Sequence, residues 1–221
     1  MNLIDLHAHH FAQEQGVIRI SNILFADQIE KQLKSDGLYS IGIHPRYIQE
    51  QTFSTDLSIL KQFAKSPFVK AIGESGMDYL SDIPLSIQEK VFIAMIELSE
   101  SAAKPLILHC VKAHAEIIQL HRQLKPTQPW IMHGFNQRNS IAEMVLQEGL
   151  HLSFGKALLQ ENSPASLLLK SFPDLSFFLE TDESEISINE IYTLASARTG
   201  KSREELISSI SNLYHHTFHH D

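Results

Sequence analysis

The chain opens with a His-x-His pair at the end of a short apolar run. Residues 3–6 have the pattern of a β-strand, and His7 and His9 follow at once. Because successive side chains of a strand alternate between its faces, His7 and His9 are expected to project to the same side. Imidazole suits zinc and the neighbouring first-row metals. The pair therefore indicates a divalent-metal site at the start of the chain.

Further metal-binding side chains stand at the ends of other predicted strands. His109, His133 and Asp182 end or almost end a strand pattern, and Glu74 comes just after one. Taken singly, each is more often an ordinary polar residue of a loop than a ligand. Their recurrence at separate strand ends reverses that expectation and predicts one site on a common rim.

Strand and helix patterns alternate along the whole chain. The strands are predicted at residues 3–6, 17–23, 38–43, 68–72, 105–108, 130–132, 150–154 and 175–181. The helices between them are predicted at 27–35, from a cap at Ser54 or Thr55 to a stop at Pro67, at 86–103, from about 113, at 141–149, from 163 and from 202. Two of the helix starts have capping boxes, Ser86-Ile87-Gln88-Glu89 and Ser202-Arg203-Glu204-Glu205, and a third has Ser163-Pro164.

This alternation predicts the fold class. About eight strand–helix units in a chain of 221 residues are typical of a (β/α)8 TIM barrel, whose active site lies at the carboxyl ends of the strands. The connection after His10 is too short for a full helix, so one outer helix is expected to be missing. A doubly wound open sheet is the alternative, but it would normally carry a Gly-rich phosphate loop, which the sequence lacks. Residues 1–221 are predicted to form one domain.

Composition indicates where the protein is located and which partners it is expected to bind. No apolar run reaches the ~20 residues that a membrane helix needs, and no basic start precedes an apolar stretch as in a signal peptide. The single Cys110 cannot form an internal disulfide, so a cytoplasmic location is predicted. The net charge of −8 argues against a broad basic surface for nucleic acid, although bound metal ions would supply positive charge locally. No membrane partner is expected, the oligomeric state stays open, and a monomer is compatible with the sequence.

The predicted ligand set is large enough for two metal ions. Four histidines and two carboxylates can hold two divalent ions, with one carboxylate between them. Ions ~3.5–4 Å apart can polarise an ester or a phosphate and activate water near neutral pH. Histidine-rich ligation favours zinc or manganese over magnesium, and the sequence leaves the choice open.

The strand-end residues belong to an ordered series of short motifs. These are Ile-Asp-Leu-His-Ala-His, Gly-Ile-His-Pro, Ala-Ile-Gly-Glu-Ser-Gly-Met-Asp-Tyr, Lys-Pro-Leu-Ile-Leu-His, Ile-Met-His-Gly-Phe and Leu-Glu-Thr-Asp. Each motif alone is weak, but the series in this order resembles the TatD family of metal-dependent hydrolases over essentially the whole chain. Members of that family are deoxyribonucleases that depend on magnesium, manganese or zinc and often act from a 3′ end on single strands.

The resemblance implies a role for each strand-end residue. His7 and His9 would bind the first ion, and Glu74 would bridge the two ions. His109 and His133 would bind the second ion. Asp182 would bind the first ion and act as general base toward the attacking water. The implied reaction is hydrolysis of a phosphodiester bond at a nucleic-acid 3′ end.

The chain departs from the family pattern around these residues. His10 and Phe11 replace an apolar residue and an aspartate, and Val111-Lys112-Ala113 replaces Arg-Asp-Ala. Glu183 and Glu185 stand where a Pro-rich aromatic loop is common, and their charge would repel a phosphate backbone. Two alternatives therefore stay open: a metal-dependent hydrolase of a small-molecule amide, ester or aminoacyl ester, and a non-catalytic metal-binding protein.

Several other residues are candidates for substrate contacts. His44 either contacts substrate or is a loop residue held by Pro45, and Asp78 either orients a ligand or stabilises a turn. The best candidates for phosphate binding are Arg46, Lys112 and Lys156, although each alone is more often a solvated charge.

Two acidic residues and a histidine cluster have supporting roles in this interpretation. Asp5 and Glu180 are predicted to hydrogen-bond the ligand imidazoles and fix their tautomers. The C-terminal His215, His216, His219 and His220 are interpreted as a frayed helix end that complements the helix dipole.

Overall fold

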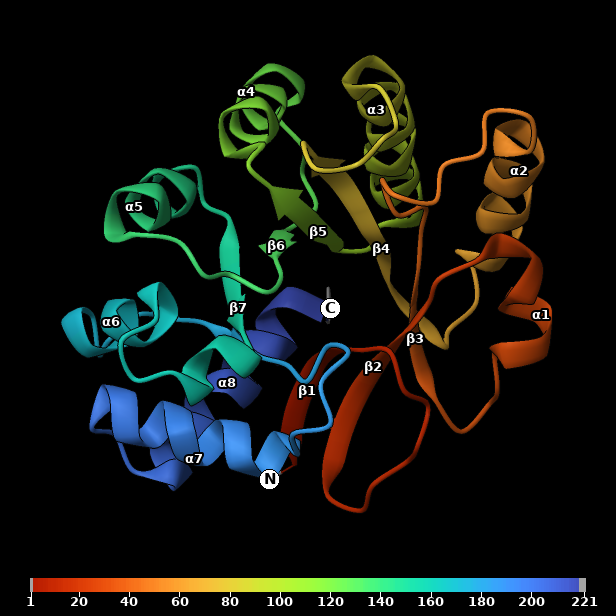
Figure 1. Cartoon of the computed structure of the whole chain (residues 1–221). Helices are drawn as coiled ribbons and strands as arrows, with labels where there is room; N and C mark the ends of the chain where they lie inside the picture. The colour runs from red at the N-terminus through yellow and green to blue at the C-terminus, as the bar shows by residue number, and fades with distance from the viewer. Residues whose placement is uncertain (1, 219–221) are drawn as a thin grey trace. The chain divides into compact units, whose positions relative to one another are not determined.

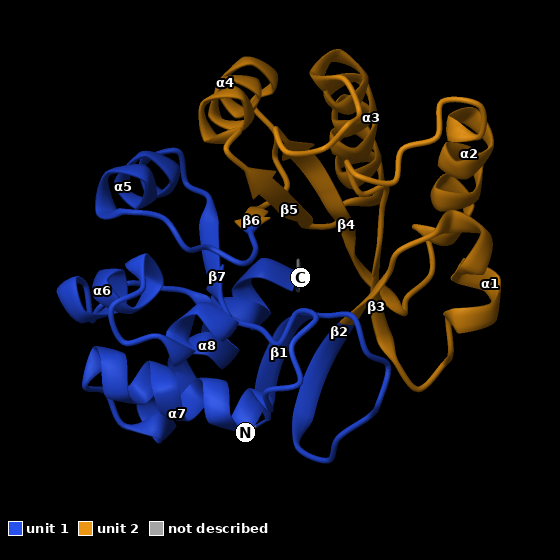
Figure 2. Cartoon of the chain, in the orientation of Figure 1, with its two compact units in different colours: residues 1–20, 132–221 blue, residues 21–131 orange. Residues whose placement is uncertain are grey.

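The structure is a computed structural model, and it describes residues 2–218. The chain divides into two compact units, coloured blue and orange in Figure 2. The first unit consists of residues 1–20 and 132–221, and the second consists of residues 21–131. The prediction that residues 1–221 form one domain stays a prediction.

The second unit is built from strands that alternate with helices along the chain (Figure 1). Strand β3 pairs in parallel with β4, and β4 pairs in parallel with β5. The chain enters this unit within β2 and leaves it within β6. Its elements are β2 (Val17–Ile23), a 3-10 turn (Ala26–Gln28), α1 (Ile29–Gln32), β3 (Leu38–Ile41), α2 (Phe53–Phe63), β4 (Val69–Asp78), α3 (Leu85–Ala102), β5 (Leu106–Val111), α4 (His114–Leu124) and β6 (Trp130–Met132).

The first unit contains the start of the chain and its last ninety residues. Strand β7 pairs in parallel with β8, and the residues after β8 form a parallel bridge to the end of β1. Its elements are β1 (Leu3–Ala8), α5 (Asn139–Gln147), β7 (His151–Phe154), a 3-10 turn (Lys156–Leu159), α6 (Pro164–Ser171), β8 (Phe178–Leu179), α7 (Ile188–Thr199) and α8 (Arg203–Phe218).

The connection between β1 and β2 contains no helix, as predicted. It is held instead by Arg19, whose guanidinium donates to the carbonyl of Ala12 and, at 3.2 Å, to the carboxylate of Glu14. The Nε of Arg19 also forms a buried ion pair with Asp5 at 2.8 Å. A single side chain thus ties this loop to the strand that carries the His-x-His pair.

Strand β4 is longer than predicted. It was expected to end at Ile72, but it continues to Asp78 through a bulge, so Glu74 lies inside the strand. Ile72 pairs with Leu106 and Ser75 with Leu108, which leaves one extra residue on β4. Gly76 in the extended part of β4 allows close approach to β5, because a Cβ on this residue would lie 2.0 Å from the His109 carbonyl oxygen.

Three helix predictions need correction. The helix predicted at 27–35 is only a 3-10 turn followed by the four residues of α1. Helix α3 begins at Leu85 after Pro84, so Ser86 does not cap it and that capping box is wrong. Helix α7 was not predicted, although Ser187 caps its start by accepting from Glu190 N.

Helix α2 begins at Phe53 and α5 at Asn139, so the predicted cap of α2 at Ser54 or Thr55 is also wrong, whereas the starts of α6 and α8 agree with the sequence. Ser163 caps α6 by accepting from Ser166 N, with Pro164 at the first helical position. Ser202 and Glu205 exchange hydrogen bonds as a capping box before α8. His215 and His216 lie in the last turn of α8, whereas His219 and His220 lie outside the described residues. Within residues 2–218 there is no helix with the length and apolar character that crossing a membrane requires.

Replacing Ser163 by Ala tests the cap of α6. The Ser163 hydroxyl accepts from Ser166 N at 3.1 Å and donates to the Ala157 carbonyl at 2.7 Å. Its loss should lower the free energy of unfolding by about 1–2 kcal/mol in urea denaturation. The matched control is Ser171→Ala at the exposed end of the same helix, which should change it by less than about 0.5 kcal/mol. Equal effects of the two changes would contradict the assignment of the cap.

Candidate metal centre

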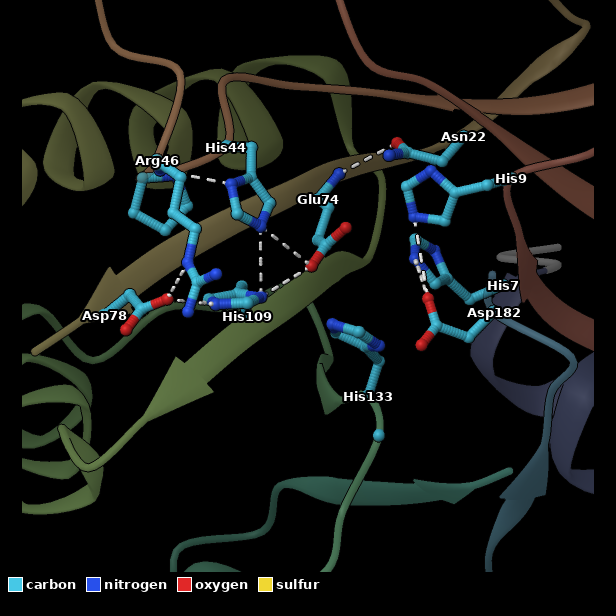
Figure 3. Close-up of polar contacts among 12 residues, drawn as sticks. His7, His9, Asn22, His44, Arg46, Glu74, Asp78, His109, His133 and Asp182 are labelled. Carbon is cyan, nitrogen blue, oxygen red and sulfur yellow. Dashed lines mark hydrogen bonds and ion pairs between the residues drawn. The ribbon is translucent and has the colours of Figure 1, made fainter. Parts of the chain in front are cut away.

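The first unit brings three predicted ligands into one group. His7, His133 and Asp182 each offer a ligand atom, and these atoms lie within 4.8 Å of one another. His9 joins them, with its Nε2 3.6 Å from Asp182 Oδ1, while His7 Nε2 lies 3.9 Å from the same oxygen (Figure 3). The two rings of the His-x-His pair thus both face the Asp182 carboxylate, as the strand geometry predicted.

Backbone hydrogen bonds explain this grouping. Asp182 N donates to the His7 carbonyl at 2.9 Å, and His9 N donates to the Asp182 carbonyl at 3.1 Å. Asp182 has a φ of 54°, a left-handed conformation that aspartate tolerates better than most residues. The chain therefore turns directly after β8 and holds the carboxylate against the end of β1.

A buried carboxylate orients the ring of His133. Glu180 Oε1 lies 3.3 Å from His133 Nδ1 and also accepts from Gly134 N at 2.7 Å. Burial would raise the pKa of Glu180, but the hydrogen bond with His133 and the nearby imidazoles bring that pKa below its ordinary value. An ionised Glu180 holds the proton of His133 on Nδ1 and leaves Nε2 for a metal ion. The contact predicted for Glu180 is present.

Asp5 does not orient a ligand imidazole, and that prediction is wrong. Its carboxylate accepts from Thr181 N and Thr181 Oγ1, both at 2.9 Å, and pairs with Arg19. Because its described partners are Thr181 and Arg19, Asp5 fixes the strand rather than an imidazole ring. His10 lies on the same threonine, with its Nε2 3.2 Å from Thr181 Oγ1.

The second unit holds another group of candidate ligands. His44, Glu74 and His109 offer ligand atoms that lie within 4.8 Å of one another. Glu74 Oε1 lies 2.7 Å from His109 Nδ1 and 3.4 Å from His44 Nε2, and the two ring nitrogens are 3.1 Å apart. His44, which the sequence suggested as a substrate contact, thus lies among the predicted ligands of this unit (Figure 3).

An asparagine that sequence reasoning missed supports Glu74. Asn22 is buried on β2, and its Oδ1 accepts from Glu74 N at 3.0 Å and from Ser40 Oγ at 3.1 Å. The backbone N–H of Glu74 sits at the bulge and has lost its regular partner in the sheet, so the Asn22 amide satisfies it. The signal in the sequence was a single amide side chain in the predicted strand 17–23, which otherwise consists of Val, Ile, Arg19 and Ser21.

Asp78 orients the ring of His109 from the opposite side. Its Oδ2 lies 3.1 Å from His109 Nε2 and 2.5 Å from Arg46 Nε, and its Oδ1 accepts from Leu80 N at 2.8 Å. Burial would raise the pKa of Asp78, but the hydrogen bonds from Arg46, Leu80 and His109 lower it below the ordinary value. An ionised Asp78 can therefore accept a proton from His109 Nε2, while His109 Nδ1 faces Glu74.

Gln88 is a second supporting residue that the sequence did not reveal. It was assigned to the capping box of α3, but it is buried and brackets the backbone of Asp78. Gln88 Oε1 accepts from Asp78 N at 2.7 Å, and its Nε2 donates to the Asp78 carbonyl at 3.1 Å. Helix α3 therefore fixes the end of β4, where Asp78 stands.

The predicted phosphate-binding cations lie at the edges of these groups. Arg46 is 47% exposed and pairs with Asp78, while Lys156 is 60% exposed with its Nζ 3.8 Å from Asp182 Oδ2. Lys112 is exposed at the end of β5. Glu183 and Glu185 are also exposed, directly after Asp182. Phosphate binding by the three cations stays a prediction.

The residues of both groups suit a divalent metal ion. Each group combines imidazole nitrogens with a carboxylate, the donor set that zinc and manganese accept. In each group a histidine has its far nitrogen held by an ionised acid, as is usual for metal-ligating imidazoles. The resemblance assigned His109 and His133 to one ion. These residues lie in different units, so that allocation stays a prediction.

Comparison with known proteins identifies the family. The family model described as "TatD related DNase" matches residues 11–190. The chain belongs to this family. A curated relative from Musicola paradisiaca, named 3'-5' ssDNA/RNA exonuclease TatD, is 30% identical over 71% of this chain and 61% of its own length. An uncharacterized metal-dependent hydrolase from Buchnera aphidicola is 29% identical over 68% of this chain and 57% of its own. The chain thus spans about six tenths of the length of these relatives.

Solved structures share the fold of this TatD-family chain. A TatD homologue from Escherichia coli matches with a TM-score of 0.83 at 19% identity, covering 98% of this chain and 97% of the other. An uncharacterized amidohydrolase from Saccharomyces cerevisiae matches with a TM-score of 0.73 at 13% identity, covering 98% and 99%. The predicted fold, a (β/α)8 barrel of the metal-dependent hydrolase type, is confirmed, and the open-sheet alternative is excluded.

Glu180→Gln tests the support of His133. Removing the negative charge beside His133 Nδ1 weakens the preference for a lone pair on Nε2, so the affinity for Zn²⁺ should fall by about 10- to 100-fold. Competition with a fluorescent chelator measures this affinity. The matched control is Glu204→Gln, an exposed glutamate of α8, which should bind Zn²⁺ like the parent. A folded Glu180→Gln variant with parental affinity would contradict the assigned role.

Proposed function

We propose that this chain is a two-metal hydrolase that cleaves phosphodiester bonds at the 3′ end of single-stranded nucleic acid. The observation that carries the proposal is the pair of histidine–carboxylate groups, His7–His133–Asp182 and His44–Glu74–His109, in a member of the TatD-related family. The names of the relatives, which include 3'-5' ssDNA/RNA exonucleases, support the choice of substrate. One ion is assigned to each group.

In this proposal, different side chains of the chain perform different steps of the reaction. Bound divalent ions would withdraw charge from a phosphodiester and lower the pKa of water, which is the chemistry that the side chains cannot supply alone. A carboxylate oxygen of Asp182 accepts the proton of the attacking water. Glu74 neutralises positive charge in its group, and the bridging role implied by the resemblance remains part of the proposal. Zinc or manganese suits these imidazole-rich groups better than magnesium.

The cations at the edges would bind the phosphate backbone. Lys156 lies beside Asp182 and Arg46 beside Asp78, so each can hold a phosphate next to a candidate ligand group. Such contacts matter in a chain with a net charge of −8, because the remaining surface repels nucleic acid. Lys112, exposed after β5, is the third candidate.

A second candidate function is favoured by the acidic loop after β8. Glu183 and Glu185 are both exposed within three residues of Asp182, where they disfavour a polyanion. An uncharged ester or amide of a small molecule, or an aminoacyl ester, would not meet this repulsion. The same metal-assisted attack of water would serve either substrate.

Asp182→Asn tests the catalytic assignment. The amide cannot accept the proton of the attacking water, so turnover should fall by at least about 10²-fold while the melting temperature stays near the parental value. The assay follows shortening of single-stranded DNA with a free 3′ end, with and without a chelator, beside a panel of esters and amides. Glu204→Gln serves as the control. A folded Asp182→Asn protein with parental turnover would exclude this mechanism, and turnover of the panel alone would favour the second candidate.

The double change Glu183→Gln, Glu185→Gln tests the electrostatics of the acidic loop. If a polyanion is the substrate, loss of two negative charges should lower KM for single-stranded DNA several-fold at low salt. The difference should shrink at higher salt, because screening shortens the reach of these charges to about 8 Å at 0.15 M. Steady-state kinetics at several salt concentrations give this comparison. A KM that is unchanged at all salt concentrations would show that nucleic acid does not pass this loop.

A further inference from the structure

We propose that His44 is not a metal ligand but a hydrogen-bond donor that positions the Glu74 carboxylate. This inference rests on the proposed function, because it takes Glu74 and His109 as ligands of an ion. His44 lies close enough to both to count as a third ligand by distance alone. The direction of its hydrogen bonds points to the other role.

A tight turn places a backbone donor against the ring of His44. Tyr47 N donates to the His44 carbonyl at 3.0 Å, so residues 44–47 form a turn with Pro45 at its second position. Proline suits that position because its ring fixes φ near the value that the turn needs. Ser81 Oγ also donates to the Pro45 carbonyl at 3.3 Å, which holds the turn from outside.

The turn decides which nitrogen of His44 carries the proton. Arg46 N donates to His44 Nδ1 at 3.1 Å, so Nδ1 presents a lone pair to the backbone. A neutral imidazole has one donor and one acceptor nitrogen, which places the proton on Nε2. That Nε2 faces the ligand group, at 3.4 Å from Glu74 Oε1 and 3.1 Å from His109 Nδ1.

The ring of His109 also contacts Glu74, but through its Nδ1. Its Nε2 lies 3.1 Å from Asp78 Oδ2 and its Nδ1 lies 2.7 Å from Glu74 Oε1, so with the proton on Nε2 the lone pair of Nδ1 faces the Glu74 carboxylate. Two lone pairs at this distance repel unless positive charge lies against both, which is what a metal ion held by Glu74 and His109 supplies. With His109 Nδ1 on the ion, Glu74 remains as the acceptor for the proton of His44 Nε2.

One residue, Arg46, therefore contacts both His44 and the Asp78 partner of His109 in this ligand group. The backbone N–H of Arg46 sets the tautomer of His44, and its side chain holds the Asp78 carboxylate that sets the tautomer of His109 (Figure 3). One ring is left to offer a proton and the other a lone pair. His44 is thus a positioning residue, since it acts on the reaction through Glu74.

The tautomer can be read directly by nuclear magnetic resonance. In protein labelled with ¹⁵N-histidine, long-range ¹⁵N–¹H spectra show which nitrogen of each ring bears the proton. The His44 signals are assigned by their loss in His44→Gln. We expect the Nε2–H form of His44 both without metal and with Zn²⁺ bound. A proton on Nδ1 with Zn²⁺ on Nε2 would overturn the proposal.

Two substitutions separate the roles by metal content. Glutamine keeps an N–H near the position of Nε2, whereas alanine removes it. Both His44→Gln and His44→Ala should bind as many Zn²⁺ ions per chain as the parent in elemental analysis after dialysis. Affinity should fall by about 10- to 100-fold in His44→Ala and largely recover in His44→Gln. The matched control is His216→Gln, an exposed histidine of α8. Loss of one ion in both variants would overturn the proposal.

Steady-state kinetics of the same variants provide a third test. In His44→Ala, kcat should fall more than KM changes, because Glu74 is misplaced while substrate contacts remain, and His44→Gln should restore part of kcat. Equal kcat in His44→Ala and the parent would overturn the role in positioning. If the parent protein binds Zn²⁺ but does not cleave DNA, only the proposed function is contradicted. The tautomer and metal-content results would still decide the role of His44.

Discussion

Buried negative charge is the constraint around which both ligand groups are built. Asp5, Asp78 and Glu180 are fully buried, and Glu74 is nearly so. A carboxylate removed from water is costly unless donors surround it. Asp5 has Arg19 and Thr181, Asp78 has Arg46, Leu80 and His109, and Glu180 has His133 and Gly134. Imidazole protons are among these donors, so satisfying the acids also fixes the rings.

Irregular backbone delivers the ligands that regular strands could not. The extra residue in β4 turns Glu74 out of the pairing with β5, and the left-handed Asp182, three residues after β8, bridges to the end of β1. Each irregularity has a compensating partner: Asn22 accepts from the N–H freed at the bulge, and the backbone of β1 bonds both sides of Asp182. Bulges and strained residues of this kind are common beside functional sites, where they redirect a side chain.

Metal chemistry and substrate choice depend on different residues of this chain. The chain belongs to the TatD-related family, and beside its candidate ligands His10 contacts Thr181 and acidic residues are exposed after Asp182. Metal chemistry depends on the donor atoms, and substrate choice depends on the charges around them. A chain can therefore keep its metal-dependent reaction while the loop charges change what is hydrolysed.

The sequence by itself determined the fold class and the ligand types, because strand and helix periods are local and strand-end histidines are visible in them. It located His7, His9, His109, His133 and Asp182 at strand ends, but it ended β4 too early and missed Asn22, Gln88 and α7. Only the tertiary structure decided which donors meet and which carboxylate lies against each ring nitrogen. Those outcomes depend on hydrogen bonds between segments far apart in the chain, such as Glu180 with His133 and Asp78 with His109, which no local pattern records.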